Sequence, residues 1–152
     1  MDVAIKNNEM RHLMKFQLYF SLFVYEKIDY WVPLMKYFLL RSDTIEIHCW
    51  NEEKLIVEEV QSVLKGFEKT KEYDLTIFKG KITPDVVNYL SYNNIDIEGK
   101  IKWFSIFLIN NTTTIFHSEH WGMEFFAPDV YKKDVAFIKS IMPVETNFHQ
   151  YI

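Results

Sequence analysis

The chain has 152 residues, of which 49% are hydrophobic and 17% aromatic, and its formal net charge is −4. This length supports one well-buried core and is short for two, so we expect a single globular domain over residues 1–152, with residues 1–14 either loose or a short helix. The acidic balance disfavours a protein whose main task is to bind nucleic-acid phosphates. One cysteine, Cys49, excludes an internal disulfide and a CxxC motif, which fits a reducing compartment.

An uncharged run at Phe16–Tyr25 has the length of a signal-peptide core. Glu26 and Lys27 follow it, however, where the small residues of a cleavage site belong, and the run is shorter than the roughly 20 residues that span a bilayer. We therefore predict a cytoplasmic protein with no membrane association. Apolar residues alternate along the run, which indicates a strand with one apolar face. That face consists of Phe16, Leu18, Phe20, Leu22 and Val24.

Two elements with different periods follow. Apolar residues recur at helical spacing after residue 28, which predicts a helix from about Tyr30 to Leu40. Thr44–Trp50 alternates between an apolar and a polar face and is predicted to be a strand with Cys49 buried. Asn51 is expected to cap a further helix, whose apolar stripe ends at Phe67.

The lysine-rich segment Lys65–Lys81 is expected to be mostly a solvated helix end and loop. Within it, Asp74–Lys79 is predicted to be a short strand. Thr83 and Pro84 form a helix start, because threonine caps well and proline is tolerated at the first helical position. The helix should continue to about Tyr92.

The segment after Gly99 contains the clearest hairpin signal in the chain. We predict an antiparallel hairpin over residues 101–120, with Asn110 and Asn111 as a two-residue loop. That loop would place an opposite-charge pair across the strands, which supports the register. The expected pairs are Ile109 with Thr112, Ile106 with Ile115, and Lys102 with Glu119.

Three more elements complete the chain. Met123–Phe126 is predicted to be a third antiparallel strand, and Asp129 is expected to cap a helix that Pro143 ends. The tail, Thr146–Tyr151, is either an edge strand or loose.

The predicted order is therefore strand and helix three times, then a strand meander and a final helix. The alternating part suggests crossover connections between parallel strands, and the meander adds antiparallel pairing. We expect an α/β fold, with an α+β arrangement as the alternative. In either case one mixed sheet of about five to seven strands would carry about four helices packed on it.

Several sequence signatures of catalysis are missing. The chain has no glycine-rich phosphate loop, GxGxxG, HExxH, GxSxG or zinc-deaminase pattern, and it contains only four glycines. Nucleotide-dependent chemistry is thus disfavoured, and we predict no cofactor.

The densest run of reactive residues is His117–Glu124. Its candidate catalytic residues are His117, Glu119, His120 and Glu124. In the predicted register the two histidines point to opposite faces, so they can serve one site only if the strand bulges or ends near Glu119. His48 together with His117 and His120 would make a zinc site or an acid–base pair. The favoured interpretation is structural, with these residues bonded to backbone or solvent and no metal.

A second group of residues has the composition of a partner-binding surface. Polar and aromatic residues share one face of the strand Thr44–Trp50, the next helix begins with two acids, and a tryptophan follows the hairpin. Core packing for the tryptophans and a solvated acidic face are the alternatives. The group consists of Glu46, His48, Trp50, Glu52, Glu53 and Trp121.

These features favour an interaction protein over an enzyme. The concrete hypothesis is an immunity protein or antitoxin, in which an acidic surface steers the chain to a basic toxin and aromatic anchors hold the complex. The alternative is a small hydrolytic or metal-assisted enzyme that uses His117, His120 and Glu124. A third possibility is an accessory domain that forms a homodimer through a strand edge.

Overall fold

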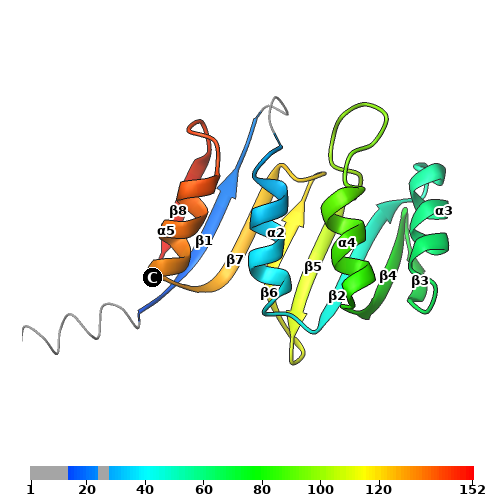
Figure 1. Cartoon of the computed structure of the whole chain (residues 1–152), viewed down its shortest axis with the longest axis horizontal. Helices are drawn as coiled ribbons and strands as arrows, with labels where there is room; N and C mark the ends of the chain where they lie inside the picture. The colour runs from blue at the N-terminus through cyan, green and yellow to red at the C-terminus, as the bar shows by residue number, and fades with distance from the viewer. Residues whose placement is uncertain (1–13, 24–27) are drawn as a thin grey trace, which may run out of the picture.

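The described part of the chain forms one antiparallel sheet of eight strands with four helices beside it (Figure 1). The computed structural model describes residues 14–23 and 28–152. Across the sheet the strand order is β3-β4-β2-β5-β6-β7-β1-β8. The elements are β1 (Lys15–Ser21), α2 (Trp31–Leu39), β2 (Thr44–Trp50), α3 (Lys54–Val63), β3 (Glu68–Glu72), β4 (Leu75–Lys81), α4 (Pro84–Tyr92), β5 (Ser105–Asn110), β6 (Thr113–Glu119), β7 (Glu124–Tyr131), α5 (Lys132–Ile141) and β8 (Asn147–Tyr151).

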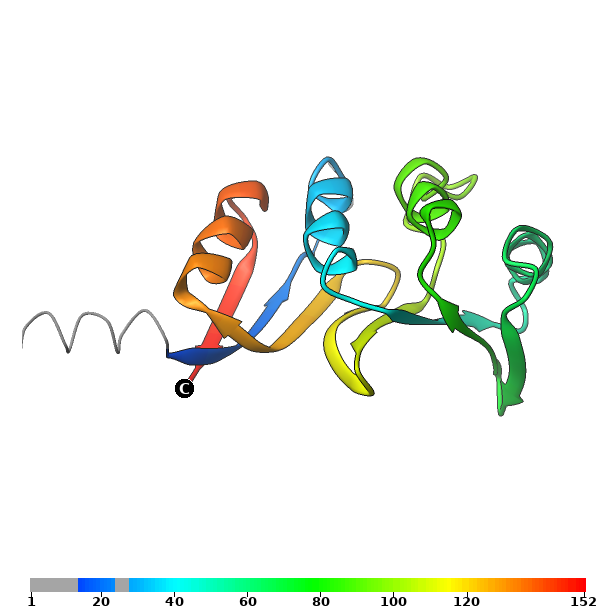
Figure 2. The same ribbon diagram turned by 60° about the horizontal axis from the view of Figure 1, so that its bottom comes forward.

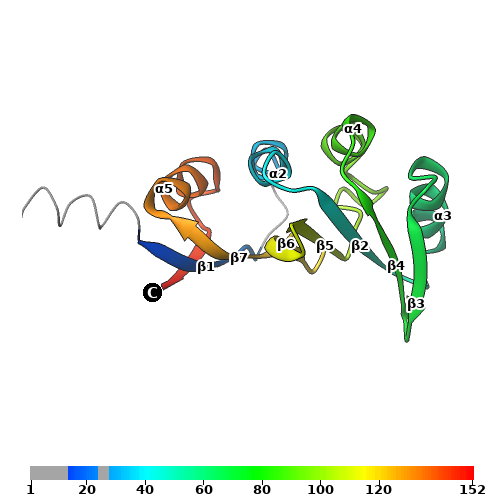
Figure 3. The ribbon, with the colours of Figure 1, turned by 90° about the horizontal axis from the view of Figure 1, so that it is seen from below.

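The helices all lie on one face of the sheet and leave the other face open (Figures 2 and 3). The core forms between the helices and the covered face, where apolar residues from alternate strand positions are buried. Phe38 of α2 stacks on Phe116 of β6 with ring centroids 4.3 Å apart, and Phe20 of β1 stacks on Phe125 of β7 at 4.9 Å. Aromatic pairs therefore join α2 to the centre of the sheet.

The predicted single sheet with helices packed on it is confirmed, but the described strands number eight, not five to seven. The strand that the sequence did not predict is β3. Every residue of β3 is exposed, so no apolar alternation marks it. It pairs with β4 across a tight turn at Tyr73, whose φ is 54°.

The expected parallel neighbours are absent from the described strands, because every observed pairing is antiparallel. The helices do join strands that run in the same direction. In three of the four connections one antiparallel strand lies between the two: β4 separates β2 from β3, β2 separates β4 from β5, and β1 separates β7 from β8. In the fourth, the three strands β5, β6 and β7 separate β2 from β1. A strand–helix–strand pattern in this sequence therefore indicates that the two strands run in the same direction, but not that they are neighbours in the sheet. The fold is thus an α+β arrangement.

The central hairpin forms, but in a different register. Its loop is Asn111-Thr112, with φ values of 52° and 70°, and Asn110 pairs with Thr113. A bulge then shifts the strands further, so that Ile106 faces Ser118. The predicted pairs of Ile109 with Thr112, of Ile106 with Ile115 and of Lys102 with Glu119 are wrong.

Two of the three predicted helix caps are also wrong. The side chain of Thr83 accepts a hydrogen bond from the Val86 backbone, as expected for a cap of α4. Asn51 instead donates to the Tyr73 carbonyl and so fixes the β3–β4 turn. Asp129 lies within β7, because that strand continues to Tyr131 before α5 begins.

The first and last predicted strands both form, but the first ends at Ser21, earlier than predicted. The predicted strand Phe16–Tyr25 corresponds to β1, and its last residues, 24 and 25, lie outside the described residues, as do residues 1–13. The tail forms β8, the edge strand beside β1. In the described part of the chain, no helix is long and apolar enough to cross a membrane.

Candidate functional site

The turn between β6 and β7 brings together three of the predicted catalytic residues. Glu119 ends β6 and Glu124 begins β7, and the two are directly paired across the strands. Between them the chain turns back through His120, Trp121 and Gly122, with φ values of 52°, 54° and 75°. Glycine is required at the third position, because a Cβ there would lie 2.8 Å from the side chain of Ile101.

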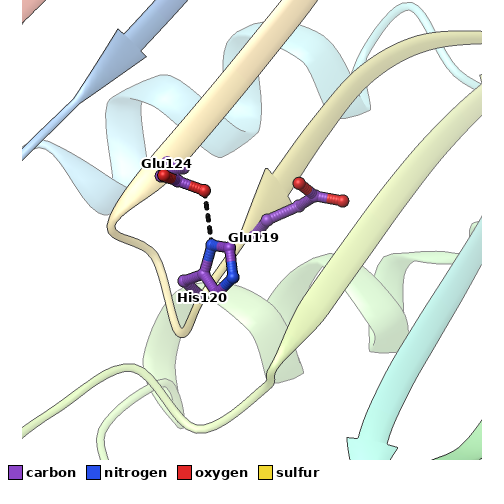
Figure 4. A group of neighbouring side chains, drawn as sticks. All are labelled: Glu119, His120 and Glu124. Atoms are coloured by element: carbon purple, nitrogen blue, oxygen red, sulfur yellow. Dashed lines mark hydrogen bonds and ion pairs between the residues drawn. The ribbon is translucent and has the colours of Figure 1, made fainter.

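This turn places the imidazole of His120 against the carboxylate of Glu124, with Glu119 at the end of the neighbouring strand (Figure 4). Nδ1 of His120 is hydrogen-bonded to Oε2 of Glu124, and the hydroxyl of Tyr19 donates to Oε1 of Glu124 at 3.0 Å. One potential ligand atom from each of Glu119, His120 and Glu124 lies within 4.8 Å of the others. The condition stated for a shared site, a strand that ends near Glu119, is therefore met.

His117 lies beside this group on the open face of the sheet. Its Nδ1 is buried, makes no hydrogen bond among the described residues, and lies 3.6 Å from Oε1 of Glu119. Burial lowers the pKa of His117 below its usual value, and the charge of Glu119 offsets part of that effect. The lowered pKa thus favours the neutral form of the His117 imidazole.

His48 is separated from the other two histidines. It is hydrogen-bonded to Glu46 at 2.8 Å, and its ring lies 4.8 Å from that of Phe107. The opposite neighbour of Phe107 is His117, stacked at 5.2 Å. The structure therefore does not gather His48, His117 and His120 into the three-histidine zinc site proposed from the sequence.

A row of rings that was not predicted from the sequence crosses the open face. Direct strand pairing continues the row from Phe107 and His117 through Phe126 and Tyr19 to His149 at the edge of the sheet. The rings of His117 and Phe126 are 5.2 Å apart, and those of Tyr19 and His149 are 5.9 Å apart. In the sequence, these residues occupy the strand positions that alternate with core residues. Only the order of the strands in the sheet places them side by side.

Three of the predicted partner-binding residues, Trp50, Trp121 and Glu53, are linked by contacts around the end of the sheet, whereas Glu46 and His48 bond to each other on the open face. Phe104 packs edge-on against both Trp50 and Trp121, at 5.2 and 4.8 Å. The indole nitrogen of Trp121 donates to Oε1 of Glu53 at 2.9 Å. Glu52 precedes Glu53 at the start of α3. A continuous surface thus runs from Trp50 to the acidic start of this helix.

A groove of about 590 Å³ opens beside that surface, between the start of α3 and the loop that joins α4 to β5. Five carboxylates and three lysines line it, so its formal charge is negative. Leu55 and Ile97 expose 81% and all of their surface at its rim. Its other acidic residues include Glu52 and Glu98, and neither forms an ion pair with another described residue.

The floor of the groove is a buried ion pair. Lys102 is only 5% exposed, and its Nζ lies 2.8 Å from both carboxylate oxygens of Glu59 and 2.5 Å from Oδ1 of Asn93. The hydroxyl of Tyr89 donates to the same carboxylate at 2.7 Å. Burial and this hydrogen bond raise the pKa of Tyr89 far above its usual value. The network fixes α3 to α4 and to the loop before β5.

Cys49 is buried on the covered face, as predicted. Burial raises the pKa of its thiol to about 12, with a smaller effect from Glu53 and Glu59. The thiolate needed for nucleophilic or metal chemistry is therefore negligible at neutral pH.

No protein-family model matches the sequence, and no curated protein or solved structure matches it significantly.

Proposed function

We propose that the chain is a cytoplasmic interaction protein that binds a cationic protein through the groove beside α3, in the manner of an immunity protein or antitoxin. The observation that carries this proposal is the combination of exposed apolar side chains with an acidic rim. Against the described residues, Leu55 is 81% exposed and Ile97 is fully exposed. Exposed apolar patches ringed by polar groups are typical of protein-binding surfaces.

The charge of the groove favours a basic partner over an acidic one. The groove has more carboxylates than ammonium groups, and the whole chain has a net charge of −4. Lys100 and Lys102 are both used in ion pairs within the molecule, to Asp96 at 2.6 Å and to Glu59 at 2.8 Å. The remaining negative charge would accelerate encounters with a basic partner and disfavour an acidic one.

The groove is held in shape before any partner arrives. Its floor is the Lys102–Glu59 pair, and one wall is fixed by the bond from Trp121 to Glu53. A partner would therefore lose little free energy in ordering this surface, which favours tight binding for its area.

The test is binding of the purified chain to the product of the neighbouring open reading frame, measured at low and high salt. Ile97→Asp and Glu98→Lys should each weaken the complex by at least tenfold, because one replaces an exposed apolar contact with a charge that must lose its water on binding and the other reverses an acidic charge of the groove. Leu40→Asp is the matched control, since Leu40 is equally exposed but lies outside the groove. Association that is absent, independent of salt, or equally weakened by Leu40→Asp would contradict the proposal.

A small hydrolytic enzyme is the second candidate. It is favoured by the contact between His120 and Glu124, because an imidazole oriented by a carboxylate is a common general base. A chromogenic ester assay would test it, with rates compared between the wild type and His120→Ala. Equal rates in the two proteins would reject this candidate.

A further inference from the structure

The pairing of Glu119 with Glu124 is unfavourable for a sheet. Two like charges directly opposite each other on neighbouring strands repel, and natural sheets usually place opposite charges there. The side chain of Glu119 is 38% exposed and that of Glu124 is 34% exposed, so both are partly shielded from solvent. A cation between the two carboxylates would convert this repulsion into attraction.

The turn supplies a third group on the same side. His120 and Trp121 both have positive φ, a backbone conformation that residues with a Cβ rarely adopt. Trp121 anchors the turn through its bond to Glu53 and its packing on Phe104. The result is that the ring of His120 lies against Glu124 (Figure 4).

The carboxylate of Glu124 is held in place by a neighbouring hydroxyl, whereas that of Glu119 has only a longer contact. The hydroxyl of Tyr19, on β1, donates to Oε1 of Glu124 and leaves Oε2 facing His120. His117 lies 3.6 Å from Glu119 on the same strand. Outer contacts of this kind orient the ligands of metal sites and adjust their affinity.

We propose that Glu119, His120 and Glu124 form a binding site for a divalent transition-metal ion of the zinc class. Imidazole and carboxylate are ligands that Zn²⁺ and Co²⁺ accept, at metal–ligand distances of about 2.0–2.2 Å. The ligand atoms already lie within 4.8 Å of one another, and the half-exposed side chain of Glu119 can rotate to close the remaining gap. Three protein ligands leave one coordination position open to water or a substrate. This site is independent of the proposed groove.

The test is titration of the metal-free full-length chain with Co²⁺, followed by its visible absorption, and with Zn²⁺, followed by calorimetry. One equivalent should bind, and His120→Ala and Glu124→Gln should each abolish the signal. Tyr19→Phe should weaken binding by roughly tenfold, because it removes only the outer hydrogen bond. His48→Ala is the matched control, because His48 is also hydrogen-bonded to a carboxylate, that of Glu46 at 2.8 Å, but lies outside the proposed site. This substitution should leave the metal affinity unchanged.

Binding of no ion would overturn the proposal, as would binding that survives in both His120→Ala and Glu124→Gln. Circular dichroism of each variant separates a lost ligand from a lost fold. If His120→Ala does not fold, Tyr19→Phe and Glu119→Gln decide: affinity equal to the wild type in both would contradict the site.

Discussion

The two faces of the sheet carry different side chains although the same strands supply both. On β2, Ile45, Ile47 and Cys49 face the helices and are buried, whereas Glu46 and His48 lie on the open face and bond to each other. The covered face holds the fold together by packing. The open face combines rings with titratable groups, which a stable sheet does not need. The titratable groups of the β6–β7 turn lie on the open face, and the groove beside α3 lies at the end of the sheet on the helix side.

The largest expected difference between the faces concerns packing. Phe116→Ala on the covered face should lower the free energy of unfolding by about 3–5 kcal/mol, because it leaves a cavity in the core. Phe107→Ala on the open face should cost about 1–2 kcal/mol, since its ring is only partly buried. Urea unfolding of both variants measures the comparison. Equal losses would show that the open face is packed as tightly as the core.

The buried lysine on the covered side should show the next largest effect. Lys102→Met should cost about 3 kcal/mol, because Glu59 and Asn93 lose the charged group that satisfies them. Lys100→Met is the control, and it should cost less, about 1 kcal/mol, since the side chain of Lys100 is 22% exposed against 6% for Lys102 and its charge is better solvated. Thermal unfolding of the two variants distinguishes a structural ion pair from a peripheral one.

Asp134 is a buried acid on the covered side, and its contribution to stability depends on pH. Burial alone would raise the pKa of Asp134, but hydrogen bonds from Tyr37, the Tyr131 backbone and Arg41 hold it below its ordinary value. Its contribution to stability is therefore present above the ordinary aspartate pKa and is lost as the pH falls through the lowered one.

Asp134→Asn should accordingly cost about 2 kcal/mol at neutral pH and progressively less in acid. Asp129→Asn is the control, because the ion pair of Asp129 with Lys15 is half-exposed and worth little. A cost for Asp134→Asn that stays constant as the pH falls would contradict this account of the network.

The smallest effect is expected on the open face, at His117. Because the pKa of His117 is lowered in the folded state, the unfolded chain binds its proton first as the pH falls below 6.5. Stability should therefore decrease on acidification through that range. His117→Gln should remove part of this decrease between about pH 7.5 and 5.5, as measured by urea unfolding. A variant with the same pH dependence as the wild type would show that His117 does not contribute.

Much of the fold was predictable because its elements have clear periods. The alternation of Thr44–Trp50 and the Thr83-Pro84 start of α4 both predicted their elements correctly. The strand β3 was not predictable, because its side chains are all exposed. The hairpin register failed because the turn uses Asn111 and Thr112, and threonine rarely adopts a positive φ.

Of the two candidate sites, one could be proposed from the sequence and the other could not. The group at the β6–β7 turn is close in sequence, so the residues could be proposed together, although only the turn geometry shows that His120 meets Glu124. The groove requires α3 and the loop before β5, which are about 40 residues apart in the chain. Lys102 was expected to pair with Glu119, so its ion pair with Glu59 at the floor of the groove was not predicted.

The central claim is that the groove beside α3 is the surface that meets a basic protein. Its most direct test is the dissociation constant of the complex with the neighbouring gene product, compared between Ile97→Asp and Leu40→Asp. Selective weakening by Ile97→Asp, by tenfold or more and with further weakening at high salt, is the predicted result. Equal constants for the two variants would contradict the claim.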